Sequence, residues 1–126
     1  MQILKIITAI ACLFILGCNR PPEKTIVGHW QVYRPEDPQG NRRQIHLYLN
    51  ADKSLRMEIH SARREPDVHY GTYELAREGK LLIVHREGNK DKTNEAEIIE
   101  LNARSLILVD HSNSPSGDTM RLKRVD

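Results

Sequence analysis

Apolar and polar side chains alternate along much of the chain, most clearly in residues 43–50 (RQIHLYLN) and 54–60 (SLRMEIH). In these two segments the apolar positions are Ile45, Leu47, Leu49, Leu55, Met57 and Ile59. A period of two is typical of β-strands that bury one face and expose the other to solvent. The stretch between them, Asn50-Ala51-Asp52-Lys53, is rich in turn-forming residues, so the pattern predicts a β-hairpin.

Short β-rich segments of this kind recur as far as the C-terminus. Eight strands are expected, over residues 25–33, 43–50, 54–60, 68–75, 80–86, 96–101, 105–110 and 119–125. The gaps are too short for crossover helices, so neighbouring strands should pair antiparallel. Closing such a sheet removes its exposed edges. The sequence therefore predicts an all-β domain over residues 25–126, an eight-stranded antiparallel up-and-down barrel that is closed or nearly closed.

The first 17 residues follow another pattern. Lys5 is their only charge, and Ile6–Gly17 is apolar but shorter than the roughly 20 residues that span a bilayer as a helix. A basic start, a short apolar stretch and a small residue predict a cleaved signal peptide helix over residues 1–17. A buried helix of the mature fold is the alternative, which is disfavoured because no later segment is patterned to cover it.

Ile15-Leu16-Gly17-Cys18 resembles the lipobox of bacterial lipoproteins. The resemblance implies cleavage before Cys18, a diacylglycerol on its thiol, and a fatty acyl group such as palmitate on its amine. Two or more chains anchor a protein stably in a membrane. Because Asn19 rather than Asp follows the cysteine, the resemblance further implies the outer membrane, with the domain facing the periplasm.

Residues 18–24 are expected to form the lipidated N-terminus and a tether, in which Pro21-Pro22 favours an extended chain. The other cysteine, Cys12, leaves with the signal peptide, so the mature domain is expected to have no disulfide and no catalytic thiol. The 19 Lys and Arg nearly balance the 17 Asp and Glu, and no basic stripe is present, which argues against a nucleic-acid partner.

Gly28-His29-Trp30 resembles the Gly-x-Trp signature on the first strand of lipocalin and other calycin barrels. The resemblance implies that Trp30 plugs the closed end of the barrel and that a basic residue of the last strand lies across its ring. Arg124 shares the strand parity of the apolar Met120 and Leu122 and is the candidate for that residue, with Arg121 as the alternative.

Further features of residues 25–126 fit a lipocalin-like domain of a small bacterial lipoprotein. They are Asp52 in the second hairpin, Gly71-Thr72-Tyr73, and the late pattern Ile98…Leu101 with Leu106-Ile107-Leu108. The resemblance implies a barrel that holds a small molecule. Once Phe14 leaves with the signal, a lining of Leu, Ile, Val and Met could leave an apolar cavity at the mouth.

The expected ligand is a small apolar or amphipathic molecule, and Tyr48, Tyr70 and Tyr73 are the candidate lining residues. Ordinary close packing of the interior, with the tyrosines in cross-strand contacts, is the alternative. A second function of a different class is a structural or adaptor module that docks envelope proteins through a strand edge or through residues 35–42 and 111–117.

The sequence gives weaker evidence for metal binding, catalysis or contact with lipid headgroups. His46 and His60 could face each other with Glu58 nearby, but scattered solvated histidines are favoured, and no metal or cofactor is predicted. Motifs for a serine nucleophile or a phosphate loop are lacking, so the chain is expected not to be an enzyme. The pairs Arg42-Arg43 and Arg63-Arg64 could contact anionic headgroups, although solvated loop charge is favoured.

Overall fold

The computed structural model describes residues 20–35, 43–62, 64–88, 92–112 and 115–126. The expected signal peptide, the lipidation site Cys18, and the arginines Arg42 and Arg63 lie outside these ranges. Within them, no helix combines the length and the apolar character that crossing a bilayer would require.

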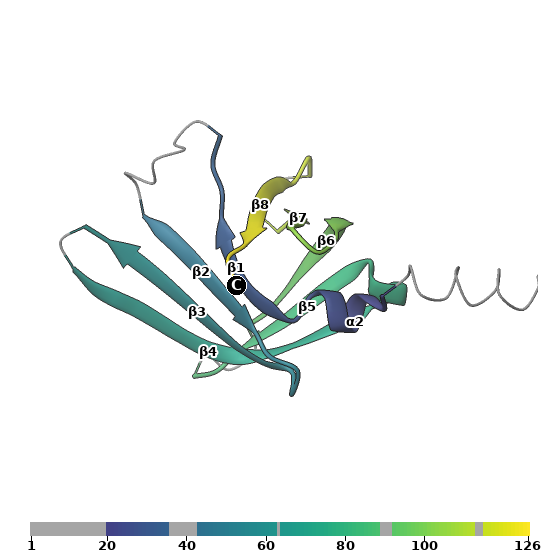
Figure 1. Ribbon diagram of the computed structural model, residues 1–126, viewed down its shortest axis with the longest axis horizontal. Coiled ribbons are helices and arrows are strands. Elements are labelled where there is room, and N and C mark those ends of the chain that lie inside the picture. The colour runs from purple at the N-terminus through teal and green to yellow at the C-terminus, as the bar shows by residue number, and fades with distance from the viewer. Residues whose placement is uncertain (1–19, 36–42, 63, 89–91, 113–114) are drawn as a thin grey trace, which may run out of the picture.

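Eight strands form a closed barrel in which each strand pairs antiparallel with its neighbours in sequence and the last pairs with the first (Figure 1). They are β1 (Gly28–Val32), β2 (Gln44–Leu49), β3 (Ser54–Ser61), β4 (Arg64–Ala76), β5 (Leu81–Arg86), β6 (Thr93–Leu101), β7 (Ser105–Asp110) and β8 (Asp118–Arg124). The predicted all-β class, strand count and antiparallel up-and-down order are therefore confirmed.

The start of the domain differs from the expectation. A short helix, α2 (Pro22–Thr25), precedes β1, so the extended conformation predicted for residues 19–24 is wrong for Pro22–Lys24. Proline suits the first position of a helix, because its fixed φ is helical and its missing N–H would have no intrahelical acceptor there. The amide of Ile26 donates to the Pro22 carbonyl at 2.9 Å, and Ile26 is fully buried beneath the barrel end.

β4 is longer than the predicted segment 68–75 and is paired unevenly. Residues 71–76 pair with β5, whereas Arg64–Tyr70 pair with β3 on one side only among the described strands, apart from one further bond from Glu87 to Tyr70. Pro66 lies in this one-sided half, where a strand tolerates proline because it needs fewer ladder hydrogen bonds.

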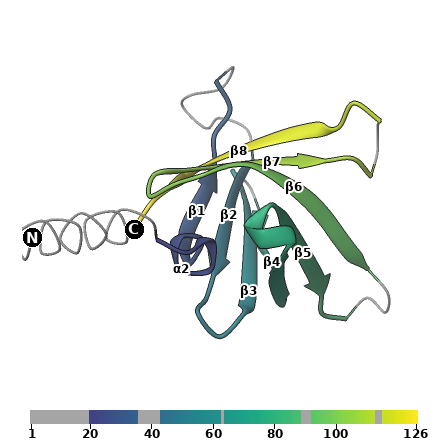
Figure 2. The same cartoon turned by 90° about the vertical axis from the view of Figure 1, so that its right-hand side faces the viewer.

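The two ends of the barrel are distinct. The closed end contains α2, the turn at residues 50–53, the 3-10 helix η1 (Arg77–Gly79), the turn at residues 102–104 and the C-terminus, as Figure 2 shows. The open end carries the β1–β2, β3–β4, β5–β6 and β7–β8 connections. The most completely buried side chains gather toward the closed end and are Trp30, Tyr73, Ile26, Leu49, Leu106 and Leu122.

Candidate functional site: the open end of the barrel

Trp30 and Arg124 plug the closed end. The Trp30 indole is 0% exposed and donates its Nε1 hydrogen to the Ile26 carbonyl at 2.8 Å. The Arg124 guanidinium lies 4.3 Å from the centre of the Trp30 ring and donates to the carbonyls of Val27, Ala103 and Thr25. Arg121, the alternative considered from the sequence, is exposed on the outer face. This end therefore offers no room for a ligand beside the indole.

Gly28 and Tyr73 complete the plug. A side chain at Gly28 would meet the Arg124 guanidinium, which accounts for glycine at this position beside Trp30. The Tyr73 hydroxyl donates to the Asn50 carbonyl at 2.7 Å, so the ring is locked against the β2–β3 turn. Burial, and to a lesser extent the Asp52 carboxylate, raise the pKa of the Tyr73 phenol.

The inward-facing apolar side chains become more exposed toward the open end. Leu108 on β7 is 6% exposed, whereas Met120, which lies opposite it on β8 and shares the parity of buried Leu122, is 41% exposed. The other apolar residues that pack on the core without being fully buried include Val32, Met57, Val84, Ala96 and Ile98. Solvent therefore reaches apolar side chains on the inner face at this end.

Polar side chains join this apolar lining at the rim. Strand alternation directs Asp67 and His69 of β4 and Arg86 of β5 inward, because they share the parity of Tyr73 and Val84. Asp110 and Asp118 lie opposite each other on β7 and β8. Hydrogen bonding from Ser112, whose amide is 2.9 Å from Asp110 Oδ1, lowers the pKa of the Asp110 carboxyl.

The three tyrosines predicted as ligand residues do not meet. Tyr73 faces inward but is part of the packed plug. Tyr48 and Tyr70 lie on the outer face, where they help to line a hollow of about 330 Å³, and they therefore do not line the interior as expected. The reason is parity, since Tyr48 alternates with the buried Leu47 and Leu49.

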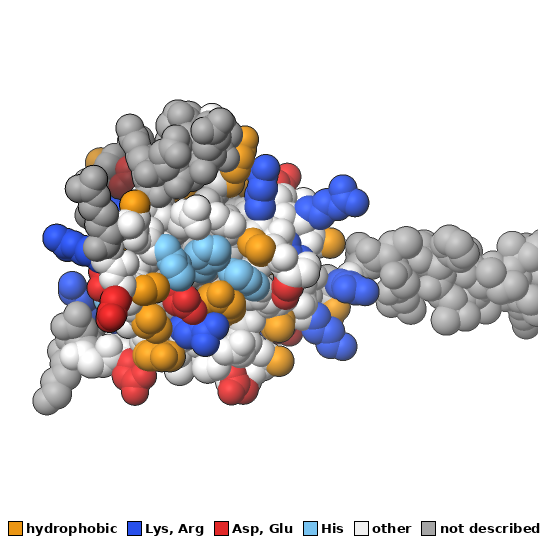
Figure 3. Space-filling view, turned by 60° about the vertical axis from the view of Figure 1, so that its left-hand side comes forward, with side chains coloured by type: hydrophobic (Ala, Val, Ile, Leu, Met, Phe, Trp, Pro, Cys, Tyr) orange, Lys and Arg blue, Asp and Glu red, His pale blue; other side chains and the backbone are white. Residues whose placement is uncertain are grey.

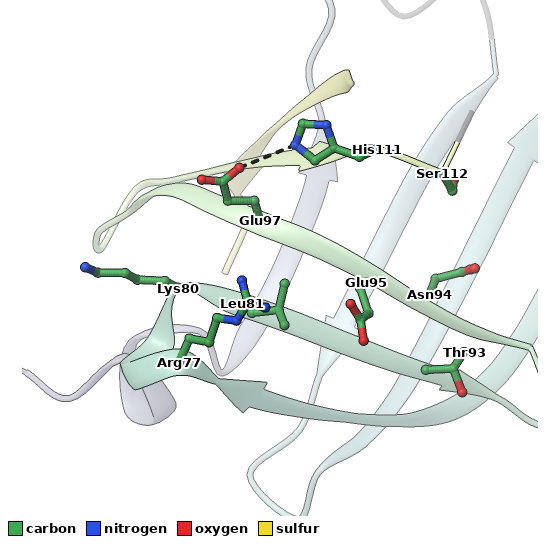
Figure 4. Close-up of a pocket in the computed structure, with 9 residues that line it drawn as sticks. All are labelled: Arg77, Lys80, Leu81, Thr93, Asn94, Glu95, Glu97, His111 and Ser112. Atoms are coloured by element: carbon green, nitrogen blue, oxygen red, sulfur yellow. Dashed lines mark hydrogen bonds and ion pairs between the residues drawn. The ribbon is translucent and has the colours of Figure 1, made fainter. Parts of the chain in front are cut away.

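A larger hollow of about 580 Å³ also lies on the outer face, across β5, β6 and the end of β7 (Figure 4). Its charged side chains include Arg77 and Lys80 at one end and Glu95 and Glu97 along β6. His111 Nε2 lies 3.4 Å from Glu97 Oε2. The mixture of both charges gives this hollow no clear preference for an anion or a cation.

Three histidines form a cluster on the outer face of β1, β2 and β3, which we call the histidine cluster: His29, His46 and His60. Figure 3 shows histidine side chains gathered at the centre of one face of the molecule. His29 Nε2 lies 2.8 Å from His46 Nδ1, and the ring centres of His46 and His60 are 5.1 Å apart. Glu58 accepts from His60 Nε2 at 3.1 Å. The prediction from the sequence placed His46 near His60 and Glu58 but did not include His29.

Burial lowers the pKa of His46, and the neighbouring His29 and His60 lower it further, against the opposing effect of Glu58. The short His29–His46 contact requires one ring to donate and the other to accept, so at least one of the two is neutral. As placed, no three His, Cys, Asp or Glu side chains among the described residues could share a metal ion.

No protein-family model matches the chain, and no curated protein matches it. Among solved structures it is similar to the NMR structure of a protein from Bacteroides uniformis ATCC 8492. The two share 19% sequence identity over 85% of this chain and 93% of that chain, with a TM-score of 0.63. A likeness at this level of identity establishes a shared fold alone.

Proposed function

We propose that this protein is a membrane-anchored lipoprotein with a lipocalin-like domain, whose open end binds a small apolar or amphipathic molecule in the cell envelope. The observation that carries the proposal is the contrast between the two barrel ends. Trp30 is completely buried at one end, whereas inward-facing Met120 is 41% exposed at the other. Exposed apolar surface on a concave inner face favours the binding of an apolar ligand, because binding removes that surface from water.

The position of α2 at the closed end suits an anchored arrangement. Anchoring through Cys18 would attach the lipid at the closed end, because α2 lies there and directly follows residues 18–21. Since Pro22–Thr25 is helical, only residues 19–21 separate Cys18 from α2, and three residues reach roughly 10 Å at most. The open end would then point away from the bilayer, toward the periplasm in the outer-membrane location that Asn19 implies.

The anchor can be tested separately from the ligand. The full chain produced in a Gram-negative host should appear in the membrane fraction, with a mass that corresponds to residues 18–126 plus diacylglycerol and one acyl chain. Cys18→Ser should abolish both the processing and the added mass. A wild-type chain that keeps residues 1–17, or that carries no lipid, would contradict the proposed anchor.

The ligand can be tested with the lipidated chain held in lipid discs bounded by an uncharged, non-aromatic polymer. Trp30 is the only tryptophan, so its fluorescence reports unfolding of the barrel without interference from the disc. A ligand that binds only the folded barrel raises its Tm. We expect 1-decanol, a small amphiphile, to raise the Tm, and native mass spectrometry to detect a co-purified apolar molecule. A barrel that is always empty and whose Tm does not respond would refute the ligand-binding function.

An adaptor module is the second candidate, and the one-sided half of β4 is the observation that favours it. Val68 and Tyr70 are 41% and 55% exposed on this half, which has a free edge among the described strands. Pro66 and the charges of Glu65 and Asp67 oppose strand addition there, because such residues protect natural edges. Of the two loops suggested by the sequence, residues 36–42 and 113–114 lie outside the described ranges.

In-cell photo-cross-linking separates the two functions. A photoreactive residue in place of Tyr70 should capture one discrete envelope protein if the edge docks a partner. The matched position is Ile99, which is 57% exposed on β6, a strand separated from β4 by β5. Cross-links that are the same from both positions, or that are absent from both, would exclude docking at this edge.

A further inference from the structure

Arg86 is the last residue of β5 and belongs to the inner face at the open end. On this strand Leu82 is buried and Val84 packs against the core, so alternation directs Arg86 inward as well. Its flanking residues, His85 and Glu87, are both exposed, whereas Arg86 itself is half-buried. A guanidinium therefore lies at the boundary between the packed interior and the solvated mouth.

The Arg86 guanidinium lacks a partner within the described ranges. Its Nε atom is shielded from solvent and has no hydrogen-bond acceptor, and no described carboxylate lies within ion-pair distance. Arg124, the other inward arginine near the core, instead donates to backbone carbonyls at the closed end. Shielding a charged donor from water without an acceptor is costly, so an acceptor that reaches Arg86 would be bound favourably.

The neighbours of Arg86 suggest the chemistry of that acceptor. Gly71 lies directly opposite on β4 and contributes no side chain, and partly buried Val84 and Met57 belong to the same inner face. The acidic residue Asp67 on β4 is exposed and lies about 13 Å nearer the strand end than Gly71, so water screens it. Asp110 accepts a hydrogen bond from the Ser112 amide, and Asp118, opposite it on β8, is exposed. A planar guanidinium on the same inner face as apolar side chains fits a carboxylate head with an aliphatic tail.

We propose that Arg86 binds the head group of a single-chain carboxylate amphiphile whose aliphatic tail lies against the apolar inner face. This inference rests on the proposed ligand-binding function and assigns it a ligand class. The carboxylate would accept hydrogen bonds from the Arg86 guanidinium, whose shielded Nε hydrogen has no acceptor among the described residues. The tail would cover the partly exposed Met57, Val84 and Met120.

The test uses the full lipidated chain in the same discs and compares three probes with equal tails: decanoate, 1-decanol and decylamine. Wild-type protein should bind decanoate about tenfold more tightly than 1-decanol, since a charge-assisted hydrogen bond is replaced by a weaker one, and decylamine most weakly. Arg86→Gln should remove the preference for decanoate and leave the affinity for 1-decanol unchanged. Arg121→Gln, which removes the same charge from the exposed outer face of β8, is the matched control and should behave as wild type.

The head-group preference of the wild-type chain is measured without any variant, so the test does not depend on the folding of Arg86→Gln. Equal binding of decanoate and 1-decanol by the wild type would overturn the role of Arg86 while leaving the ligand-binding function intact. A preference for decanoate that survives in Arg86→Gln would overturn it as well. Absence of binding by all three probes would instead refute the proposed function itself.

Discussion

The Arg124 guanidinium lies over the Trp30 ring at 4.3 Å and, in the same position, donates to the Val27 carbonyl at 2.8 Å and to the Ala103 carbonyl at 2.6 Å. Trp30 and Arg124 are also direct cross-strand partners between β1 and β8, the pair that closes the barrel. One side chain therefore joins the first strand, the last strand and the β6–β7 turn.

Replacement of Arg124 by alanine should lower the free energy of unfolding by roughly 3 kcal/mol, because the cation–π contact and the charge-assisted hydrogen bonds are lost together. Arg124→Lys should lose less, since a cation over the ring is retained. Guanidinium chloride unfolding followed by Trp30 fluorescence measures both. Arg121→Ala on the exposed outer face should change stability by less than about 0.5 kcal/mol. Equal effects of the two alanine variants would refute this account of the closed end.

Tyr73→Phe should lower the free energy of unfolding by about 1 kcal/mol, because it leaves the ring packed but removes the hydrogen bond to the Asn50 carbonyl. Tyr70→Phe is the matched control, since its hydroxyl belongs to a side chain that is 55% exposed. Urea unfolding of the two variants and the wild type gives the comparison. If Tyr73→Phe proved as stable as wild type, the hydroxyl would have no structural role in the plug.

A methyl group at Gly71 should destabilise the barrel by more than about 2 kcal/mol, because it would collide with the backbone carbonyl of His85 and force β4 and β5 apart. Gly88→Ala meets open space but keeps a left-handed φ of 84°, so it should cost only about 1 kcal/mol. The urea midpoints of the two variants check the ranking. A smaller loss at Gly71 than at Gly88 would show that the β4–β5 contact is looser than the structure indicates.

Stability should fall as the pH drops below the ordinary histidine range, and the histidine cluster should contribute to the fall. The pKa of His46 is lowered in the folded state, so below pH 6.5 the unfolded chain binds more protons at this site than the folded chain does. The contribution is present above the unfolded pKa and is lost as the pH falls toward the folded value. Urea unfolding at pH 7.5 and pH 5 measures the slope.

His46→Gln should reduce this pH dependence, because its amide does not titrate. His69→Gln is the control, since His69 is exposed on β4 and lies outside the cluster. The interpretation fails if the two variants show the same slope as the wild-type chain.

Most of the architecture followed from local sequence. The alternation in residues 43–60 and the short turns predict antiparallel pairing wherever the period of two is clear. The same parity places Arg124 with Leu122 on the inner face. It also places Tyr48 on the other face of the strand from Leu47 and Leu49, so the sequence alone was sufficient to exclude Tyr48 from the interior. The prediction of Tyr48 as a lining residue did not follow that parity.

Other features depended on contacts between distant segments. The early half of β4 is a strand because β3 supplies its hydrogen bonds. Its local sequence, with Pro66 and the charges around it, predicts a loop instead. His29 reaches His46 through the β1–β2 register, which no local pattern specifies across the connection between these strands. Arg86 follows an apolar run, Leu81–Val84, in which the period of two is hidden, so only burial showed which way it faces.

Apart from the early half of β4, the chain by itself determined which segments become strands, because strand formation and side-chain alternation are properties of neighbouring residues. Barrel closure decided how the strands are placed relative to one another. The pairing of β8 with β1 sets the position of every strand relative to the others, and with it which end is plugged and which inward side chains meet solvent. That pairing joins residues from opposite ends of the domain, whose separation in sequence carries no information about their register.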